Sequence, residues 1–162
     1  MPKVISNSSP LIHLSRIGEL TLLRYFFDEI IVPEAVYREC VIEGKNREDA
    51  KRIRKAKWIK VAKIKNTDLK KAFMMVLDEG EAEAIVLALE KSADLILLDE
   101  YEARKVARNY TLNVTGTIGV LIRAKYEEKI TTLKDVLEKL KETGFWLNDD
   151  LYTEILKKVD EL

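Results

Sequence analysis

The apolar positions of the chain alternate between short aliphatic runs and longer stretches with helical spacing. The short runs at residues 4–5, 30–32 and 95–98 have the length and composition of buried strands. A further short strand is expected at residues 113–115. Between these runs, apolar residues recur at helical spacing, and turn residues such as Gly18 end the stripes. Strands that alternate with helices predict an α/β fold, a three-layer α/β/α sandwich with a mainly parallel central sheet.

The helical stripes are distinct enough to predict where each helix lies. Pro33 is expected to open a helix, because proline at the first helical position loses no hydrogen bond. Residues 45–65 also have a helical pattern, and they are heavily basic. Outside the central stretch described next, helices are expected at residues 11–17, 20–26, 34–41, 45–65, 69–76, 104–109, 118–140 in two parts, and 151–159.

The stretch from Leu77 to Glu100 carries most of the information on function. Asp78 and Glu81 have the spacing of a capping box before an apolar run, which gives Glu81 a structural role. Glu83 lies on a helix that is apolar nearly all round and therefore buried, where an unpaired carboxylate is unfavourable. Asp99 follows a buried strand at its carboxyl end, where ligands bind in open α/β sheets. We therefore expect Glu83 and Asp99 to meet at one site.

Length and composition favour one domain. The chain has 162 residues, 47% of them hydrophobic, which suffices for one substantial core. We expect a single domain over residues 1–162, with the C-terminal helices from about residue 132 packed on it or extending it. Lys and Arg together number 28, as do Asp and Glu, so the net charge alone does not favour nucleic acid or membrane as a partner.

The cellular setting is also constrained by composition. Cys40 is the single cysteine, so an internal disulfide is excluded and this residue is expected in the core. No uncharged apolar run approaches the roughly 18 residues of a membrane span, so we expect a cytoplasmic protein with no membrane partner. The many Glu and Lys residues and the absence of glutamine are typical of thermophile proteins.

Four oxygen-bearing side chains are predicted to gather at one edge of the sheet. Asn7 ends the first strand and Asp99 a later one, while Glu39 and Glu83 lie on helices that can reach the same edge. A site made only of oxygen ligands suits Mg²⁺ or Mn²⁺ rather than zinc. Such ions activate water for phosphodiester hydrolysis. Additional residues expected to assist this site are Ser8, Glu102, Thr115 and Thr117.

Five motifs together resemble the PIN-domain family, in the branch with an N-terminal NSSPLI-type motif. They are NSSPLI at residues 7–12, VPEAVYRE at 32–39, LDEGEAEAI at 77–85, LLDE at 97–100 and GTIGVL at 116–121. The resemblance covers most of the chain and implies a parallel-sheet α/β/α sandwich. It also implies an Mg²⁺- or Mn²⁺-dependent ribonuclease, often the toxin of a toxin–antitoxin pair and often a homodimer.

The resemblance also implies a set of site residues. The four acidic positions of the family fall on Asn7, Glu39, Glu83 and Asp99, which would hold the metal, and Glu39, Glu83 and Asp99 would be catalytic. Asn7 stands where active members carry aspartate, so a silent module that binds RNA or a protein partner is the alternative. A phosphatase would need a nucleophilic aspartate at this same position and ranks last.

The residues also have simpler interpretations. Glu83 can be a helix-terminal carboxylate favoured by the helix dipole, and Asp99 can cap the next helix. The basic run is usually a solvated helical face, with Trp58 in the core. If the run instead holds single-stranded RNA, phosphate contacts and base stacking are expected from Lys51, Arg52, Lys55 and Trp58. The expected partners are thus RNA, a small antitoxin protein and a second copy of the chain.

Overall fold

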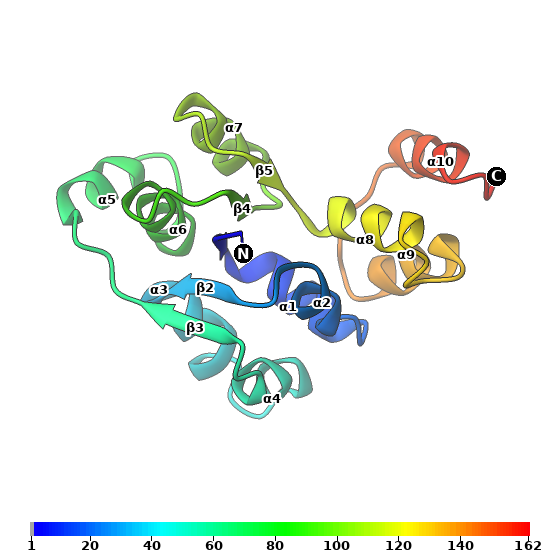
Figure 1. Ribbon diagram of the computed structural model, residues 1–162, viewed down its shortest axis with the longest axis horizontal. Coiled ribbons are helices and arrows are strands. Elements are labelled where there is room, and N and C mark those ends of the chain that lie inside the picture. Colours follow the sequence, from blue (N-terminus) through cyan, green and yellow to red (C-terminus); the bar gives the residue numbers. More distant parts are fainter. Residues whose placement is uncertain (1) are drawn as a thin grey trace.

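The computed structural model describes residues 2–162 and has a five-stranded parallel sheet at its centre (Figure 1). The strands are β1 (Val4–Ser6), β2 (Ile30–Pro33), β3 (Ile59–Ala62), β4 (Leu95–Leu97) and β5 (Val114–Thr115). Their order across the sheet is β3-β2-β1-β4-β5, so the first strand of the chain is the central one. In the register of β1 with β4, Val4 pairs with Leu95 and Ser6 with Leu97.

Helices follow the strands and cover both faces of the sheet, which confirms the predicted sandwich. They are α1 (Ser8–Arg16), α2 (Thr21–Phe27), α3 (Glu34–Tyr37), the π-helical turn η1 (Arg38–Ile42), α4 (Glu48–Lys55), α5 (Thr67–Phe73), α6 (Glu79–Glu90), α7 (Tyr101–Asn109), α8 (Thr117–Tyr126), α9 (Leu133–Glu142) and α10 (Asp149–Lys158).

Two hydrophobic clusters lie on opposite faces of the sheet. Val4 belongs to the cluster formed with α1, α2, α8, α9 and α10, and the next residue, Ile5, belongs to the cluster under α5, α6 and α7. This separation follows from the strand, since successive side chains point to opposite faces. Leu137 of α9 and Ile155 of α10 share the first cluster with Leu14 of α1, so the C-terminal helices are part of one continuous core.

The prediction of a helix over residues 45–65 is wrong in its second half. The helix α4 ends at Lys55, and residues 59–62 form β3, the strand at one edge of the sheet. Only Ile59 of this strand is fully buried, while Lys60 and Val61 are exposed. Lysine on an edge strand discourages pairing with other chains, and the same lysines made the segment resemble a solvated helical face.

No helix in residues 2–162 is long and apolar enough to cross a membrane. The predicted burial of Cys40 is confirmed, because the residue is 1% exposed within the larger cluster.

Candidate functional site

Asn7 lies at the carboxyl end of the central strand. It follows β1 directly and precedes the first residue of α1, and its backbone N–H donates to the Leu97 carbonyl at 3.0 Å. The side chain is 3% exposed, yet within the described chain its Oδ1 accepts no hydrogen bond. A buried polar atom without a partner is rare in folded proteins. Asn7 therefore offers an oxygen that is free to bind a ligand.

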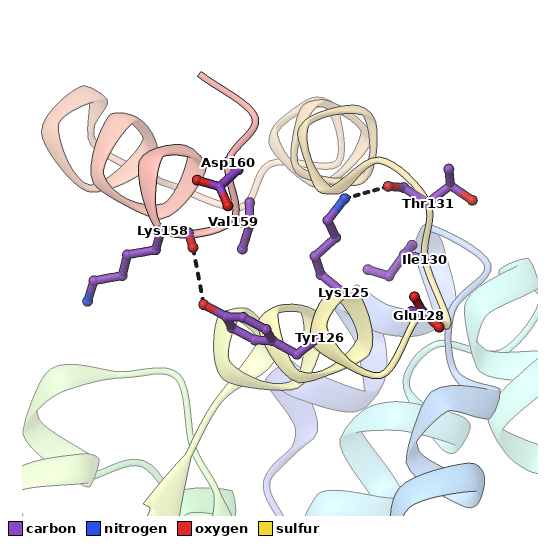
Figure 2. A pocket seen from close by; sticks show the side chains of 8 residues that line it. All are labelled: Lys125, Tyr126, Glu128, Ile130, Thr131, Lys158, Val159 and Asp160. Atoms are coloured by element: carbon purple, nitrogen blue, oxygen red, sulfur yellow. Dashed lines mark hydrogen bonds between the residues drawn. The ribbon is translucent and has the colours of Figure 1, made fainter.

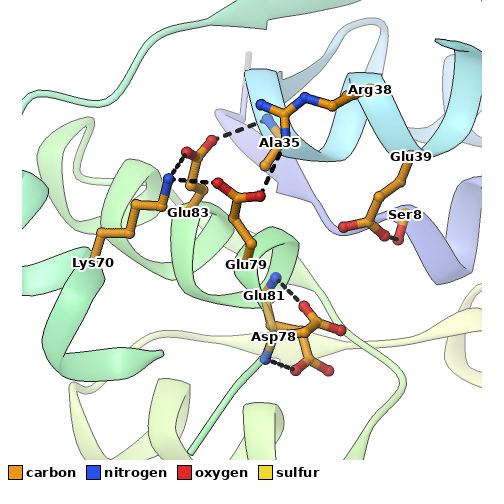
Figure 3. Close-up of polar contacts among 9 residues, drawn as sticks. All are labelled: Ser8, Ala35, Arg38, Glu39, Lys70, Asp78, Glu79, Glu81 and Glu83. Atoms are coloured by element: carbon orange, nitrogen blue, oxygen red, sulfur yellow. Dashed lines mark hydrogen bonds and ion pairs between the residues drawn. The ribbon is translucent and has the colours of Figure 1, made fainter. Parts of the chain in front are cut away.

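Glu39 lies on the π-helical turn η1, a rare element that occurs often at functional sites. Its Oε2 accepts a hydrogen bond of 2.8 Å from the Ser8 hydroxyl (Figure 3). Burial raises the pKa of Glu39; the Ser8 hydrogen bond opposes this, and the nearby carboxylates of Asp78, Glu43 and Glu79 raise it further. The ionised form of Glu39 is thus only partly stabilised by its surroundings.

Gly80 shows that the oxygens of Asn7 and Glu39 converge. A Cβ at residue 80 would collide with Oε1 of Glu39 and would lie 3.3 Å from Oδ1 of Asn7. Both oxygens therefore face the first turn of α6, and glycine leaves the space that they occupy. A side chain at residue 80 would displace the Glu39 carboxylate from its position near Oδ1 of Asn7.

Glu81 caps its helix as predicted and also lies near Glu39, which the sequence analysis did not predict. The predicted capping box is confirmed: Asp78 Oδ1 accepts from the Glu81 N–H at 2.8 Å, and Glu81 Oε1 accepts from the Asp78 N–H at 3.1 Å. Burial raises the pKa of Glu81, the Asp78 N–H lowers it, and the carboxylates of Asp78, Glu100 and Glu39 raise it again. The capping role accounted for this residue so well that nothing else in the sequence pointed to its position near Glu39.

Glu83 is engaged in a different direction. Its Oε1 accepts from the backbone N–H of Ala35 at 3.0 Å, and its Oε2 accepts from the Lys70 ammonium at 2.6 Å. Lys70 also binds Glu79 at 2.8 Å, and Glu79 in turn binds Arg38 at 3.0 Å. Figure 3 shows this cluster apart from Glu39 and Ser8. A cation is therefore already in place beside Glu83.

Asp99 is held by three hydrogen bonds of 2.7 Å. Ser9 and Thr117 donate their hydroxyls to Oδ2, and the backbone N–H of Thr117 donates to Oδ1. The adjacent residues Ser8 and Ser9 thus link the start of α1 to Glu39 and to Asp99. A carboxylate can accept about four hydrogen bonds, so Asp99 keeps capacity for one more partner.

Of the four residues predicted to assist the site, the structure places Ser8 on Glu39 and Thr117 on Asp99. Thr115 ends β5 with its hydroxyl against Gly119. Glu102 is exposed on α7 and forms no hydrogen bond or ion pair with any residue that the structure describes.

Three of the four predicted ligands are thus linked, and the fourth is separate. Asn7 and Glu39 are together, Asp99 joins them through Ser9, and Glu83 is bound to Lys70. Nowhere in residues 2–162 do three or more Asp, Glu, His or Cys side chains form a cluster that could hold a metal ion. The free oxygens of Asn7 and Glu39 nevertheless fit a hard cation, because Mg²⁺ keeps several waters and needs only one or two carboxylates plus phosphate oxygens.

The residues predicted to contact RNA lie near the amino ends of the strands, whereas the candidate site lies at their carboxyl ends. Trp58 precedes β3, and its carbonyl accepts from the Ile30 N–H at the amino end of β2. Arg52 donates to the Ser15 carbonyl at the last turn of α1, a helix of nine residues and so about 13 Å long. Lys55 and Trp58 line a shallow cavity there, and Lys51 pairs with Glu48 on the exposed side of α4.

A larger cavity of about 460 Å³ lies between the end of α8 and α10 (Figure 2). Lys125 donates to the Thr131 carbonyl at 2.6 Å, and the Tyr126 hydroxyl donates to the Lys158 carbonyl at 3.1 Å. Lys125 also pairs with Glu161 at 3.0 Å. These contacts connect the C-terminal helix to α8 at the end remote from Thr117. The residues around this cavity therefore stabilise the packing of α10 on α8.

Comparison with known proteins agrees with the fold. A sequence model of the PIN domain matches residues 3–161. No curated protein matches the chain. PIN domains are generally nucleases that use divalent cations, and such a fold suits a site at the carboxyl edge of a parallel sheet. Since the match spans nearly the whole described structure, the chain belongs to the PIN-domain family.

Proposed function

We propose that the protein is a ribonuclease that hydrolyses phosphodiester bonds of single-stranded RNA with Mg²⁺ or Mn²⁺ bound at Asn7 and Glu39. The observation that carries this proposal is the buried, unpartnered Oδ1 of Asn7 beside a carboxylate whose pKa is raised by burial. A cation between them would satisfy both groups. When bound, such a cation lowers the pKa of a water and neutralises charge on the phosphate.

The surrounding residues orient the acidic groups. Ser8 fixes the carboxylate of Glu39, while Ser9 and Thr117 fix that of Asp99, which can still accept one further hydrogen bond or bind a cation. The amino ends of α1, α6 and α8 all lie at this edge, next to Asn7, Gly80 and Asp99. Because helix amino ends carry partial positive charge, they favour an RNA phosphate at this place.

Glu83 acts in this proposal as a positioning residue. It accepts from the N–H of Ala35, in the first turn of α3, and α3 continues directly into the turn that carries Glu39. Glu83, itself held by Lys70, thereby fixes the position of the turn that carries Glu39. A metal bound directly by Glu83 would lie next to the Lys70 ammonium and be repelled by it.

The experiment that tests the proposal is Mn²⁺-dependent cleavage of a fluorescent single-stranded RNA whose two ends are blocked, which reports endonuclease activity. Glu39→Gln and Asp99→Asn should lose cleavage. Glu43→Gln is the matched control, because Glu43 is an exposed carboxylate one turn further along the same segment. Equal cleavage by Glu39→Gln and Glu43→Gln would refute the assignment of the site.

A second candidate function is a PIN-like module that binds RNA or a protein without cutting. It is favoured by the neutral Asn7 and by the lack of a three-carboxylate cluster among the described residues. Asn7→Asp separates the two: cleavage gained only in this variant would identify a weakened site, and RNA binding without cleavage in both forms would identify a binding module.

The same proposal extends to a cytoplasmic toxin that is inhibited by a small antitoxin and acts as a homodimer. Its support is the resemblance to toxin-like members of the family. Expression of the wild type should arrest growth of a host cell, and Glu39→Gln should relieve the arrest. Growth arrest that persists in Glu39→Gln would separate toxicity from this site.

A further inference from the structure

A third cavity, of about 390 Å³, begins at Asp99 and extends toward the C-terminal helices. Asp99, Gly116 and Arg104 form its polar end, while Phe145, Trp146 and Leu151 form its apolar end. Its volume lies in the range of about 300–1,000 Å³ that is usual for small-ligand sites. The cavity is thus continuous with the proposed site of hydrolysis and has a different character at its far end.

Trp146 is held at the surface by its neighbours. It is 80% exposed, whereas Leu147 is 8% exposed and Phe145 is half-buried. The Phe145 ring packs edge to face on His13, with centroids 5.0 Å apart and planes at 88°. Because both neighbours are anchored in the core, the backbone between them is fixed and directs the indole outward. An exposed aromatic ring that lines a cavity offers a stacking surface for a nucleobase.

Arg104 supplies positive charge at the polar end. Its Nη1 donates to the Leu98 carbonyl at 2.9 Å, and this bond fixes the guanidinium beside Gly116. No carboxylate in the described chain forms an ion pair with it within 4.0 Å. Its other N–H groups therefore remain able to bind a phosphate, for which guanidinium is well suited.

We propose that this cavity binds one nucleotide of single-stranded RNA, with the base stacked on Trp146 and a phosphate at Arg104. The inference rests on the proposed function, since it places this nucleotide next to Asp99, at the border of the proposed site of hydrolysis. Only an unpaired strand can offer such a base, because bases in a duplex are stacked on each other. An uncharged peptide fits less well, since the guanidinium of Arg104, unpaired among residues 2–162, favours an anion at the polar end.

Tryptophan fluorescence tests the stacking directly, because the chain has two tryptophans, Trp58 and Trp146. In Trp58→Phe only Trp146 emits, and titration with a short single-stranded oligoribonucleotide in EDTA should quench the emission to saturation. In Trp146→Phe only Trp58 emits, and the same titration should leave its emission unchanged. Quenching of Trp58 instead of Trp146 would overturn the inference and move the RNA to the basic run near the amino ends of the strands.

The affinity gives the second measurement. Without metal, Trp146→Ala should bind the oligoribonucleotide about 5- to 150-fold more weakly, the range for loss of one stacked base. Tyr25→Ala is the matched control, since Tyr25 is also an exposed aromatic residue but lies outside the cavity. An abasic strand with the same number of phosphates should bind wild type and Trp146→Ala equally. Equal affinity of both proteins for the base-containing strand would overturn the inference.

These readouts separate the inference from the proposed function. Binding in EDTA does not depend on cleavage. If the wild type does not cut RNA and Trp146→Ala binds RNA more weakly than the wild type, only the nuclease proposal is refuted. If the wild type cuts RNA and Trp146→Ala binds RNA as tightly as the wild type, only the proposed base site is refuted. Circular dichroism of each variant establishes that the fold is intact.

Discussion

Glu39 and Glu83 are two sheltered carboxylates on neighbouring elements, and their surroundings differ in one respect. Glu83 has a lysine ammonium at 2.6 Å and a backbone N–H at 3.0 Å. Glu39 has a serine hydroxyl and three carboxylates near it, and no Lys or Arg of the described residues forms an ion pair with it. Glu83 is thus neutralised by the Lys70 ammonium, whereas no cationic side chain within residues 2–162 pairs with Glu39. The comparison suggests that buried acids in a nuclease fold should be sorted by whether the chain itself neutralises them.

The largest effect should come from removing the charge of each acid in turn. Glu39→Gln should lower Mn²⁺-dependent cleavage by more than about 100-fold, since loss of a direct ligand should exceed the effect of losing an outer partner. Its thermal stability should stay the same or rise, because burial disfavours the ionised form. Glu83→Gln should show the reverse order, with a clear loss of stability and a smaller loss of cleavage. Equal stability losses in both variants would break the comparison.

Removing the cation beside Glu83 should destabilise the fold. Lys70→Met leaves a carboxylate that is 8% exposed with only the Ala35 N–H as partner, and we expect a loss of about 2–3 kcal/mol in urea unfolding. Lys71→Met is the matched control, since Lys71 is the exposed neighbour and should change stability by less than about 0.5 kcal/mol. Similar values for the two variants would show that the Lys70 pair contributes nothing.

Asn7→Asp should bring a second negative charge next to Glu39. Without metal we expect a loss of about 1–2 kcal/mol, since like charges in a buried site repel each other. Millimolar Mn²⁺ should restore the melting temperature of this variant and raise that of the wild type less, because a ligand stabilises the state that binds it. If the melting temperature of Asn7→Asp is the same with and without Mn²⁺, the result argues against a cation between residues 7 and 39.

The smallest effects should appear as opposite pH slopes at Glu39 and Glu161. Burial raises the pKa of Glu39, so its ionisation destabilises the fold as pH rises from the unfolded pKa through the folded one. At Glu161 burial also acts to raise the pKa, but the N–H groups of Lys134 and Leu133 and the Lys125 ammonium outweigh it and lower the pKa. Its contribution is therefore present above the unfolded pKa and is lost as pH falls through the folded one.

Unfolding in urea between about pH 3 and about pH 8 measures both slopes. The stability of Glu39→Gln relative to wild type should increase with pH, and that of Glu161→Gln should decrease with pH. Parallel slopes in the two variants would contradict the assignment of their surroundings.

The sequence predicted much of the fold because local signals and global topology agree. Asp78 and Glu81 form the expected capping box, and Asp99 lies just beyond the carboxyl end of the buried parallel strand β4. The strand β3 was missed because four residues among lysines carry too little periodicity to stand out from a basic helix. Trp146 was not among the predicted RNA contacts, since a single exposed aromatic residue has no pattern until its cavity is known.

The finer parts of the site depend on contacts that no pattern records. The partner of Glu83 is Lys70, on a separate helix, and nothing in the spacing of the two marks them as a pair. The π-helical turn under Glu39 decides where that side chain points, and it looks in sequence like a continuation of α3. Side-chain pairing of this kind is set by tertiary packing, which the one-dimensional periodicity of the chain does not encode.

The position of β1 in the middle of the sheet has a consequence for how the protein is made. Ser6 is synthesised well before Leu97, with which it pairs, and Asp99 gains two of its three hydrogen-bond donors only when Thr117 has been added. At about 5–20 residues per second, translation leaves this edge unfinished for several seconds. The carboxyl edge of the sheet is therefore completed only after Thr117 has left the ribosome, so the site proposed there cannot assemble on a shorter nascent chain.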